Sequence, residues 1–106
     1  MKPAWIAGLA LLAAAAPAVA QDAAKGQQIY TVCASCHGGD GRATTLPQYP
    51  KIGGQNQAYL VIALKAYRDG KRQGTYAAMM AATAKGLSDQ EIADVAAYVA
   101  ALGKPD

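Results

Sequence analysis

The spacing of apolar positions along residues 21–106 favours helices over strands. Alternating β-branched runs are missing, and apolar residues instead recur at intervals of three and four, as they do along one face of a helix. The pattern predicts four helices, over about residues 23–32, 57–69, 76–84 and 89–102. The fold class is therefore all-α, within one small domain.

Local start and stop signals support these helices. Asp22 and Asn56 can each cap a helix N-terminus with a side-chain oxygen, and Ser88 with Glu91 forms a capping box. Gly70 is a suitable terminator for the second helix. The predicted buried stripes are Leu60, Ala63, Leu64 and Tyr67 on the second helix, and Ile92, Val95, Val99 and Leu102 on the last one.

The first 20 residues have the composition of a secretory signal peptide rather than of a folded domain. Lys2 gives a short basic start, an apolar stretch follows, and Ala18-Val19-Ala20 matches a cleavage pattern. The apolar stretch is shorter than the roughly 20 residues that span a bilayer. We therefore expect cleavage after Ala20, a periplasmic mature domain of residues 21–106, and no membrane span in it. An uncleaved anchor is the alternative.

Cys33-Ala34-Ser35-Cys36-His37 carries the candidate chemistry of the chain. Two thiols three residues apart can add across the two vinyl groups of one porphyrin, and the next imidazole can bind its iron as an axial ligand. A redox dithiol expects a βαβ context, which is missing here. A zinc site needs a fourth ligand, and the chain has no other Cys or His. The motif therefore predicts one haem c attached through Cys33 and Cys36, with His37 on the iron.

The charge of the chain is modest. The predicted mature domain has nine Lys or Arg and seven Asp or Glu, a formal charge of +2. No dense basic run with interleaved aromatic residues occurs, so nucleic acid is not an expected partner. Lys65, Arg68 and Arg72, with Lys71, could form a basic rim that steers an acidic partner, although such a run is more often an ordinary solvated helix face.

The residues alone do not identify the second axial ligand of the iron. His37 is the only histidine, which excludes bis-histidine ligation within one chain. The candidates are Met79, Met80, a lysine or no ligand. A thioether favours ferrous iron and raises the reduction potential. Both methionines could instead be core fillers.

These motifs together resemble class I cytochrome c of the short bacterial type, found as c-553-like proteins and as the repeated domain of diheme cytochrome c4. The resemblance covers residues 22–103. It is carried by Gly26, Ile29-Tyr30, Cys33 to Gly38, Pro50-Lys51-Ile52-Gly53-Gly54-Gln55, Tyr59-Leu60, Leu64, Gly70-Lys71-Arg72, Met79-Met80, Leu87-Ser88-Asp89, Ile92 and Ala97-Tyr98.

The resemblance implies a fold of about four helices around one covalently attached haem, with Gly26 close to Tyr98 where the first and last helices cross. It also implies that the axial methionine lies seven residues before Leu87, which is Met80, with Met79 the alternative.

In the family, a proline carbonyl in the loop after the haem motif holds the other nitrogen of the axial histidine. Pro50 is placed for this role toward His37, and it would fix the ring and increase its basicity. The loop is one residue longer than the family pattern, so Pro47 is a second candidate.

The function implied by the resemblance is one-electron transfer by a periplasmic monohaem carrier that exchanges electrons with redox partner proteins and is not an enzyme. A haem subunit of a larger oxidoreductase is the first alternative, and a persistent apolar docking face would distinguish it. A haem-based gas sensor is the second, but it needs an open iron site, and the two methionines disfavour one.

Overall fold

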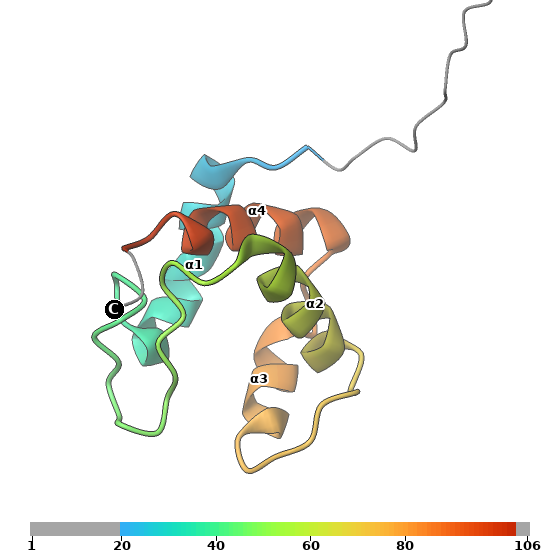
Figure 1. Cartoon of the computed structure of the whole chain (residues 1–106). Helices are drawn as coiled ribbons and strands as arrows, with labels where there is room; N and C mark the ends of the chain where they lie inside the picture. Colours follow the sequence, from blue (N-terminus) through green and yellow to red (C-terminus); the bar gives the residue numbers. More distant parts are fainter. Residues whose placement is uncertain (1–19, 104–106) are drawn as a thin grey trace, which may run out of the picture.

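The computed structural model describes residues 20–103, which form four helices. They are α1 (Ala23–His37), α2 (Gln57–Arg68), α3 (Ala77–Ala84) and α4 (Asp89–Ala100), and this part of the chain contains no strand (Figure 1). The all-α prediction is therefore confirmed. The predicted signal peptide lies outside the described residues, apart from Ala20 at its end.

Helix α1 continues five residues beyond its predicted end at residue 32. The two residues between the cysteines, Ala34 and Ser35, are compatible with a helix, and nothing interrupts the chain before Gly38. Gly38 ends the helix because its φ of 88° lies in the left-handed region that favours glycine. The whole Cys33–His37 motif is consequently held on rigid helical backbone.

The predicted caps are present. Asp22 accepts hydrogen bonds from the backbone N–H groups of Ala24 and Lys25, and Asn56 accepts one from Tyr59. Both halves of the Ser88–Glu91 capping box are formed. The other predicted ends differ from the observed ones by one or two residues, at positions where helix ends fray.

Helix α4 lies across α1 at Gly26, as the resemblance implied. A Cβ at Gly26 would overlap the backbone carbonyl of Asp94 and lie 2.9 Å from the Cβ of Tyr98. The rings of Tyr30 and Tyr98 pack beside this crossing, with their centroids 5.5 Å apart. The glycine is needed because it lets the two backbones approach.

The core lies where α4 crosses α1 and α2. Its buried members are Tyr30, Leu60, Val95, Ala96 and Val99. Helix α3 packs against α2, away from this core, and Figure 1 shows it below the layer formed by α4. The position of α3 therefore depends on α2 and on the short segment that joins α3 to α4.

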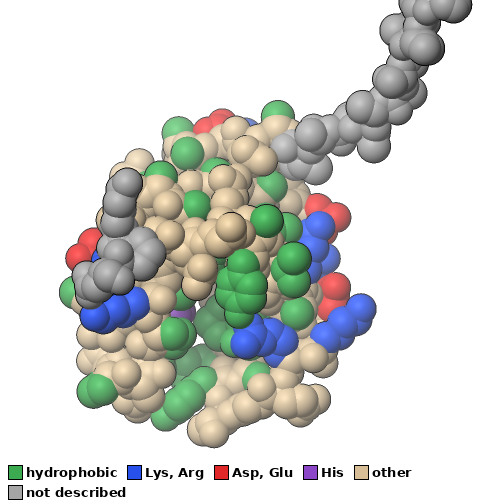
Figure 2. Space-filling model, viewed as in Figure 1, with side chains coloured by type: hydrophobic (Ala, Val, Ile, Leu, Met, Phe, Trp, Pro, Cys, Tyr) green, Lys and Arg blue, Asp and Glu red, His purple; other side chains and the backbone are tan. Residues whose placement is uncertain are grey.

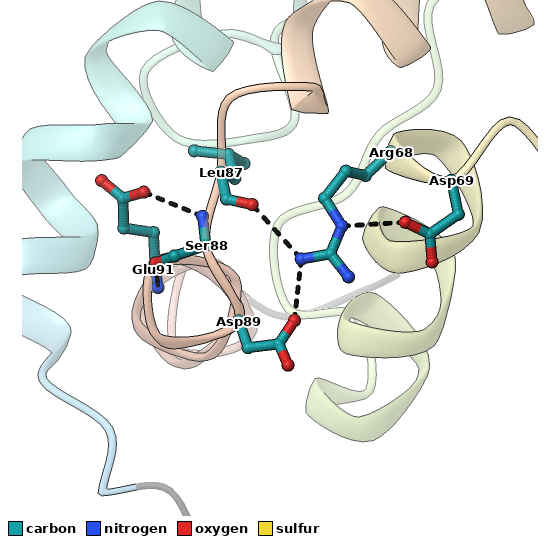
Figure 3. Close-up of polar contacts among 6 residues, drawn as sticks. All are labelled: Arg68, Asp69, Leu87, Ser88, Asp89 and Glu91. Atoms are coloured by element: carbon teal, nitrogen blue, oxygen red, sulfur yellow. Dashed lines mark hydrogen bonds and ion pairs between the residues drawn. The ribbon is translucent and has the colours of Figure 1, made fainter.

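Arg68, the last residue of α2, binds that segment. Its guanidinium donates to the Asp89 carboxylate at 2.7 Å, to the Leu87 carbonyl at 3.2 Å and to the Asp69 carboxylate at 3.0 Å (Figure 3). The contacts with Leu87 and Asp89 join the end of α2 to the turn between α3 and α4 and to the first residue of α4. The hydrogen bond from Arg68 also lowers the pKa of Asp89 from its usual value.

Replacing Gly26 with Ala should destabilise the protein by about 2 kcal/mol or more, because backbone on both sides must move to accept the methyl group. Denaturant unfolding followed by circular dichroism measures the change. The matched control is Gly86→Ala, where a Cβ would meet nothing within 4 Å and φ is not positive. Equal stability of the two variants would contradict the close crossing.

Asp89→Asn should lower the unfolding temperature at pH 7, and the difference from the wild type should close as the pH falls below 3.8. The reason is that the folded-state pKa of Asp89 is lowered, so its contribution is present above the unfolded pKa and is lost on acidification. Thermal unfolding between pH 2.5 and 7 measures this. In an Arg68→Gln background the same substitution should have a smaller effect, and an unchanged effect would exclude Arg68 as the cause.

Candidate haem-binding site

A cavity of about 490 Å³ lies between the end of α1, the loop of residues 38–56, α2 and α3. Figure 2 shows it as a hollow in the surface with mainly hydrophobic side chains around it. Its volume is in the range of pockets that hold small molecules and cofactors. Apolar side chains of every neighbouring element line it, among them Ile52, Leu60, Leu64, Leu87, Val95 and Val99.

The predicted stripe of α2 faces this cavity. Leu60 is 7% exposed and belongs to the core, whereas Ala63, Leu64 and Tyr67 are only half-buried and line the cavity wall. Helical spacing alone predicts that a face is covered, and it does not say whether protein or a bound group covers it. Part of the apolar face of α2 is thus available to a ligand.

Cys33, Cys36 and His37 lie on the last turn of α1 and line the same cavity. Residues three and four apart lie on one face of a helix, so the spacing of the motif brings all three side chains to one side. Both thiols are free. Burial raises the pKa of the Cys33 thiol above its ordinary value.

His37 is buried, at 7% exposure, and its two ring nitrogens have different surroundings. Nδ1 lies 2.8 Å from the carbonyl oxygen of Pro50. Because a carbonyl only accepts, Nδ1 carries a proton, and in the neutral ring Nε2 then carries the lone pair. Within residues 20–103 no group forms a hydrogen bond with Nε2, although a buried polar atom normally has a partner.

The structure distinguishes the two candidate prolines. The carbonyl of Pro50 contacts His37, and no hydrogen bond joins Pro47 to the ring in the described chain. Backbone hydrogen bonds hold the Pro50 loop: the amides of Ile52 and Gly53 donate to the carbonyl of Gly41, at 2.8 and 2.9 Å.

Both methionines of α3 line the cavity, and they differ in exposure. Met80 is half-buried, whereas 46% of Met79 is exposed. In Figure 1, α3 and the end of α1 lie on different sides of the space beneath α4. A flat group in the cavity could therefore be contacted by α1 on one face and by α3 on the other.

These residues fit a covalently bound porphyrin. Its flat apolar body matches the apolar walls, the two thiols match its two vinyl groups, and the unpartnered Nε2 of His37 matches the need for a nitrogen ligand to iron. The zinc alternative does not fit, because within residues 20–103 no three or more His, Cys, Asp or Glu side chains are arranged so that they could hold a metal ion. A membrane helix is likewise not found among the helices of that range.

The basic residues singled out in the sequence do not form one uniform surface. Arg68 donates to Asp69 and Asp89, so its charge is largely compensated inside the protein. The guanidinium of Arg72 lies 4.5 Å from the centre of the Tyr67 ring, in a cation–π contact at the cavity wall. Arg68 is therefore better interpreted as part of an ordinary helix face than as part of a basic rim that steers a partner.

Sequence reasoning missed a pair of tyrosines at the cavity. Tyr49 and Tyr76 meet edge to face, with ring centroids 5.8 Å apart, and Gln48 donates to the Tyr76 hydroxyl at 3.2 Å. These contacts join the 38–56 loop to the residue before α3. Both tyrosines lie outside the regular helices, so no periodic signal could have identified the pair.

Comparison with known proteins agrees with this site. The cytochrome c family model matches residues 23–103. Cytochrome c-554(548) of Halomonas halodenitrificans is 51% identical over 79 residues, which cover 74% of this chain and 94% of that protein. Cytochrome c4 of Pseudomonas aeruginosa is 43% identical over 81 residues, which cover 76% of this chain and 38% of that longer protein.

A solved structure shows the same fold. Cytochrome c4 of Acidithiobacillus ferrooxidans superposes with a TM-score of 0.67 and 29% identity, over 76% of this chain and 49% of the c4 chain. The present chain thus corresponds to about half of a cytochrome c4 and to nearly all of the cytochrome c-554(548). The chain therefore belongs to the cytochrome c family. It is a class I monohaem electron carrier, not an enzyme, and it holds one haem c through Cys33, Cys36 and His37.

Proposed function

We propose that this cytochrome is an exported electron carrier whose iron is held by His37 on one side and by Met80 on the other. The observation that supports this most directly is the buried Nε2 of His37, which has a lone pair and no hydrogen-bond partner within the described residues. When bound, the haem supplies an iron that cycles between ferric and ferrous states. The polypeptide determines how that iron is held.

His37 and Pro50 together define one side of the proposed site. The hydrogen bond from Nδ1 to the Pro50 carbonyl restricts rotation of the ring and fixes its tautomer. It also makes Nε2 more basic, which stabilises the ferric state. Rigid positioning of this ligand keeps the rearrangement that accompanies electron transfer small.

Met80 is proposed for the other side. Of the two methionines it is the less exposed one, and it occupies the family position seven residues before Leu87. Its thioether is soft and uncharged, so it favours ferrous iron and raises the reduction potential. Met79 would then lie at the outer edge of the cavity, and its exposure of 46% supports this proposal.

Electron exchange is proposed to occur at the mouth of the cavity. Four large hydrophobic side chains that line the cavity are also exposed, namely Val32, Tyr59, Tyr76 and Met79. A small apolar surface beside a redox centre suits the brief, low-area complexes that redox proteins form. We therefore expect the donor and the acceptor, both redox proteins, to use this surface in turn.

Export to the periplasm is proposed from the sequence of residues 1–20, which lie almost wholly outside the described chain. The motif supports it, because covalent haem attachment in bacteria takes place outside the cytoplasm. The bacterial relatives of this chain also support it.

Met80→Ala should open the iron to external ligands and lower the reduction potential by on the order of 0.2 V, part of the roughly 0.8 V that axial ligation spans. The far-red sulfur-to-iron charge-transfer band of the oxidised protein should disappear, and cyanide or carbon monoxide should bind. The matched control is Met79→Ala, on the preceding residue, which should keep the band. The reverse result would assign the ligand to Met79.

The mass of the exported protein should equal that of residues 21–106 with one haem, because cleavage follows Ala20 and both thiols form thioethers. Cys33→Ser/Cys36→Ser should lose haem on denaturing electrophoresis. Ser35→Ala is the control between the two cysteines, since its hydroxyl only donates to the Val32 carbonyl, and it should retain haem. A bare polypeptide with free thiols would contradict the proposed function as a whole.

A further inference from the structure

Tyr30 is a buried tyrosine whose hydroxyl reaches the haem motif. Its side chain is 3% exposed, and its hydroxyl donates to the carbonyl of Gly38, the residue after His37, at 2.6 Å. Burial raises the pKa of Tyr30 to about 12. The phenol is therefore a protonated donor at neutral pH.

The Gly38 carbonyl begins a series of contacts that leads back to His37. It also accepts from the amide of Gly41 at 3.0 Å, and the Gly41 carbonyl accepts from the amides of Ile52 and Gly53. Ile52 lies two residues after Pro50, whose carbonyl accepts from His37. The hydroxyl of Tyr30 thus anchors the turn against which the Pro50 segment rests.

Packing alone does not require this hydroxyl. The ring of Tyr30 packs at a tilt against Tyr98 in the core, and a phenylalanine ring would fill the same space. Tyr98 provides the contrast, because it makes the same ring contact but no hydrogen bond through its hydroxyl within residues 20–103. A hydroxyl buried at position 30 is costly unless it is bonded, so its role lies in the bond to Gly38.

We propose that Tyr30 is a positioning residue for the axial histidine. Its hydroxyl fixes the turn of residues 38–41, the turn fixes the segment that follows Pro50, and the Pro50 carbonyl thereby stays within hydrogen-bonding distance of His37 Nδ1. This inference rests on the proposed role of His37 as an iron ligand, and it adds a residue that does not touch the ring.

The chemical consequence follows from the direction of the hydrogen bonds. Without the hydroxyl, the turn loses one of the two donors to the Gly38 carbonyl, and the loop that carries Pro50 opens more often. His37 then shares its Nδ1 proton with Pro50 for less of the time, and Nε2 becomes a weaker base. A weaker base stabilises ferric iron less, so the reduction potential becomes more positive.

The test compares haem-loaded Tyr30→Phe with haem-loaded Tyr98→Phe, which deletes the same atom from the neighbouring ring. In the ferrous protein, hydrogen exchange of the His37 Nδ1 proton is followed by NMR, and the reduction potential is measured by voltammetry. Tyr30→Phe should exchange this proton about fivefold faster or more, as expected for the loss of one hydrogen bond, and should have a more positive potential. Tyr98→Phe should match the wild type in both.

Equal exchange rates and potentials in both variants and the wild type would overturn the proposal. Failure of the proposed function is a separate result, because it would appear in the wild type itself, as a spectrum without histidine-ligated haem c. If Tyr30→Phe does not fold, hydrogen exchange in the wild-type protein tests the proposal instead. Exchange of the Tyr30 hydroxyl proton and of the His37 Nδ1 proton should then depend on denaturant concentration with the same slope, and unequal slopes would refute a shared opening.

Discussion

The close crossing of α1 and α4 at Gly26 is the constraint on which the rest of the structure depends. Backbone of α4 occupies the place where any larger residue would project a side chain, so the angle and depth of the crossing are determined at one point. Because α1 is one continuous helix, its crossing with α4 at Gly26 also constrains where its last residue, His37, lies eleven residues further along. The haem motif is on the last turn of α1, and its position relative to the core follows from the crossing.

The second wall of the site is tied to the same helix. The amide of Gly54 donates to the carbonyl of Val99 on α4 at 2.9 Å, and this bond holds the end of the loop that carries Pro50. Helix α4 therefore positions both His37, through α1, and the carbonyl that holds its ring, through the loop. Helix α3 is attached differently, through α2 and the contacts of Arg68 with Leu87 and Asp89. The contact between Tyr49 and Tyr76 also links the residue before α3 to the loop that carries Pro50, so the two sides of the proposed site are connected across the cavity.

Local chemistry in the sequence was sufficient to predict the helices, their caps and the haem motif. The sequence pattern predicts the end of α1 too early, because the apolar periodicity fades at the Cys33–His37 motif while its backbone stays helical up to Gly38. The choice between Pro47 and Pro50 depends on how a loop folds back on a helix, which spacing does not encode. The same holds for the Tyr49–Tyr76 pair, which joins two segments outside the helices, and for the hydroxyl of Tyr30, whose acceptor lies just beyond the end of α1.

The half-buried apolar face of α2 influences when the chain can become fully compact. Ala63, Leu64 and Tyr67 are only half-buried in the described structure, and their surfaces that line the cavity are shielded from water when the prosthetic group is in place. A polypeptide without this group therefore gains less free energy from compaction, because part of its apolar surface stays in contact with water. Covalent attachment of the group is then the step that completes the interior.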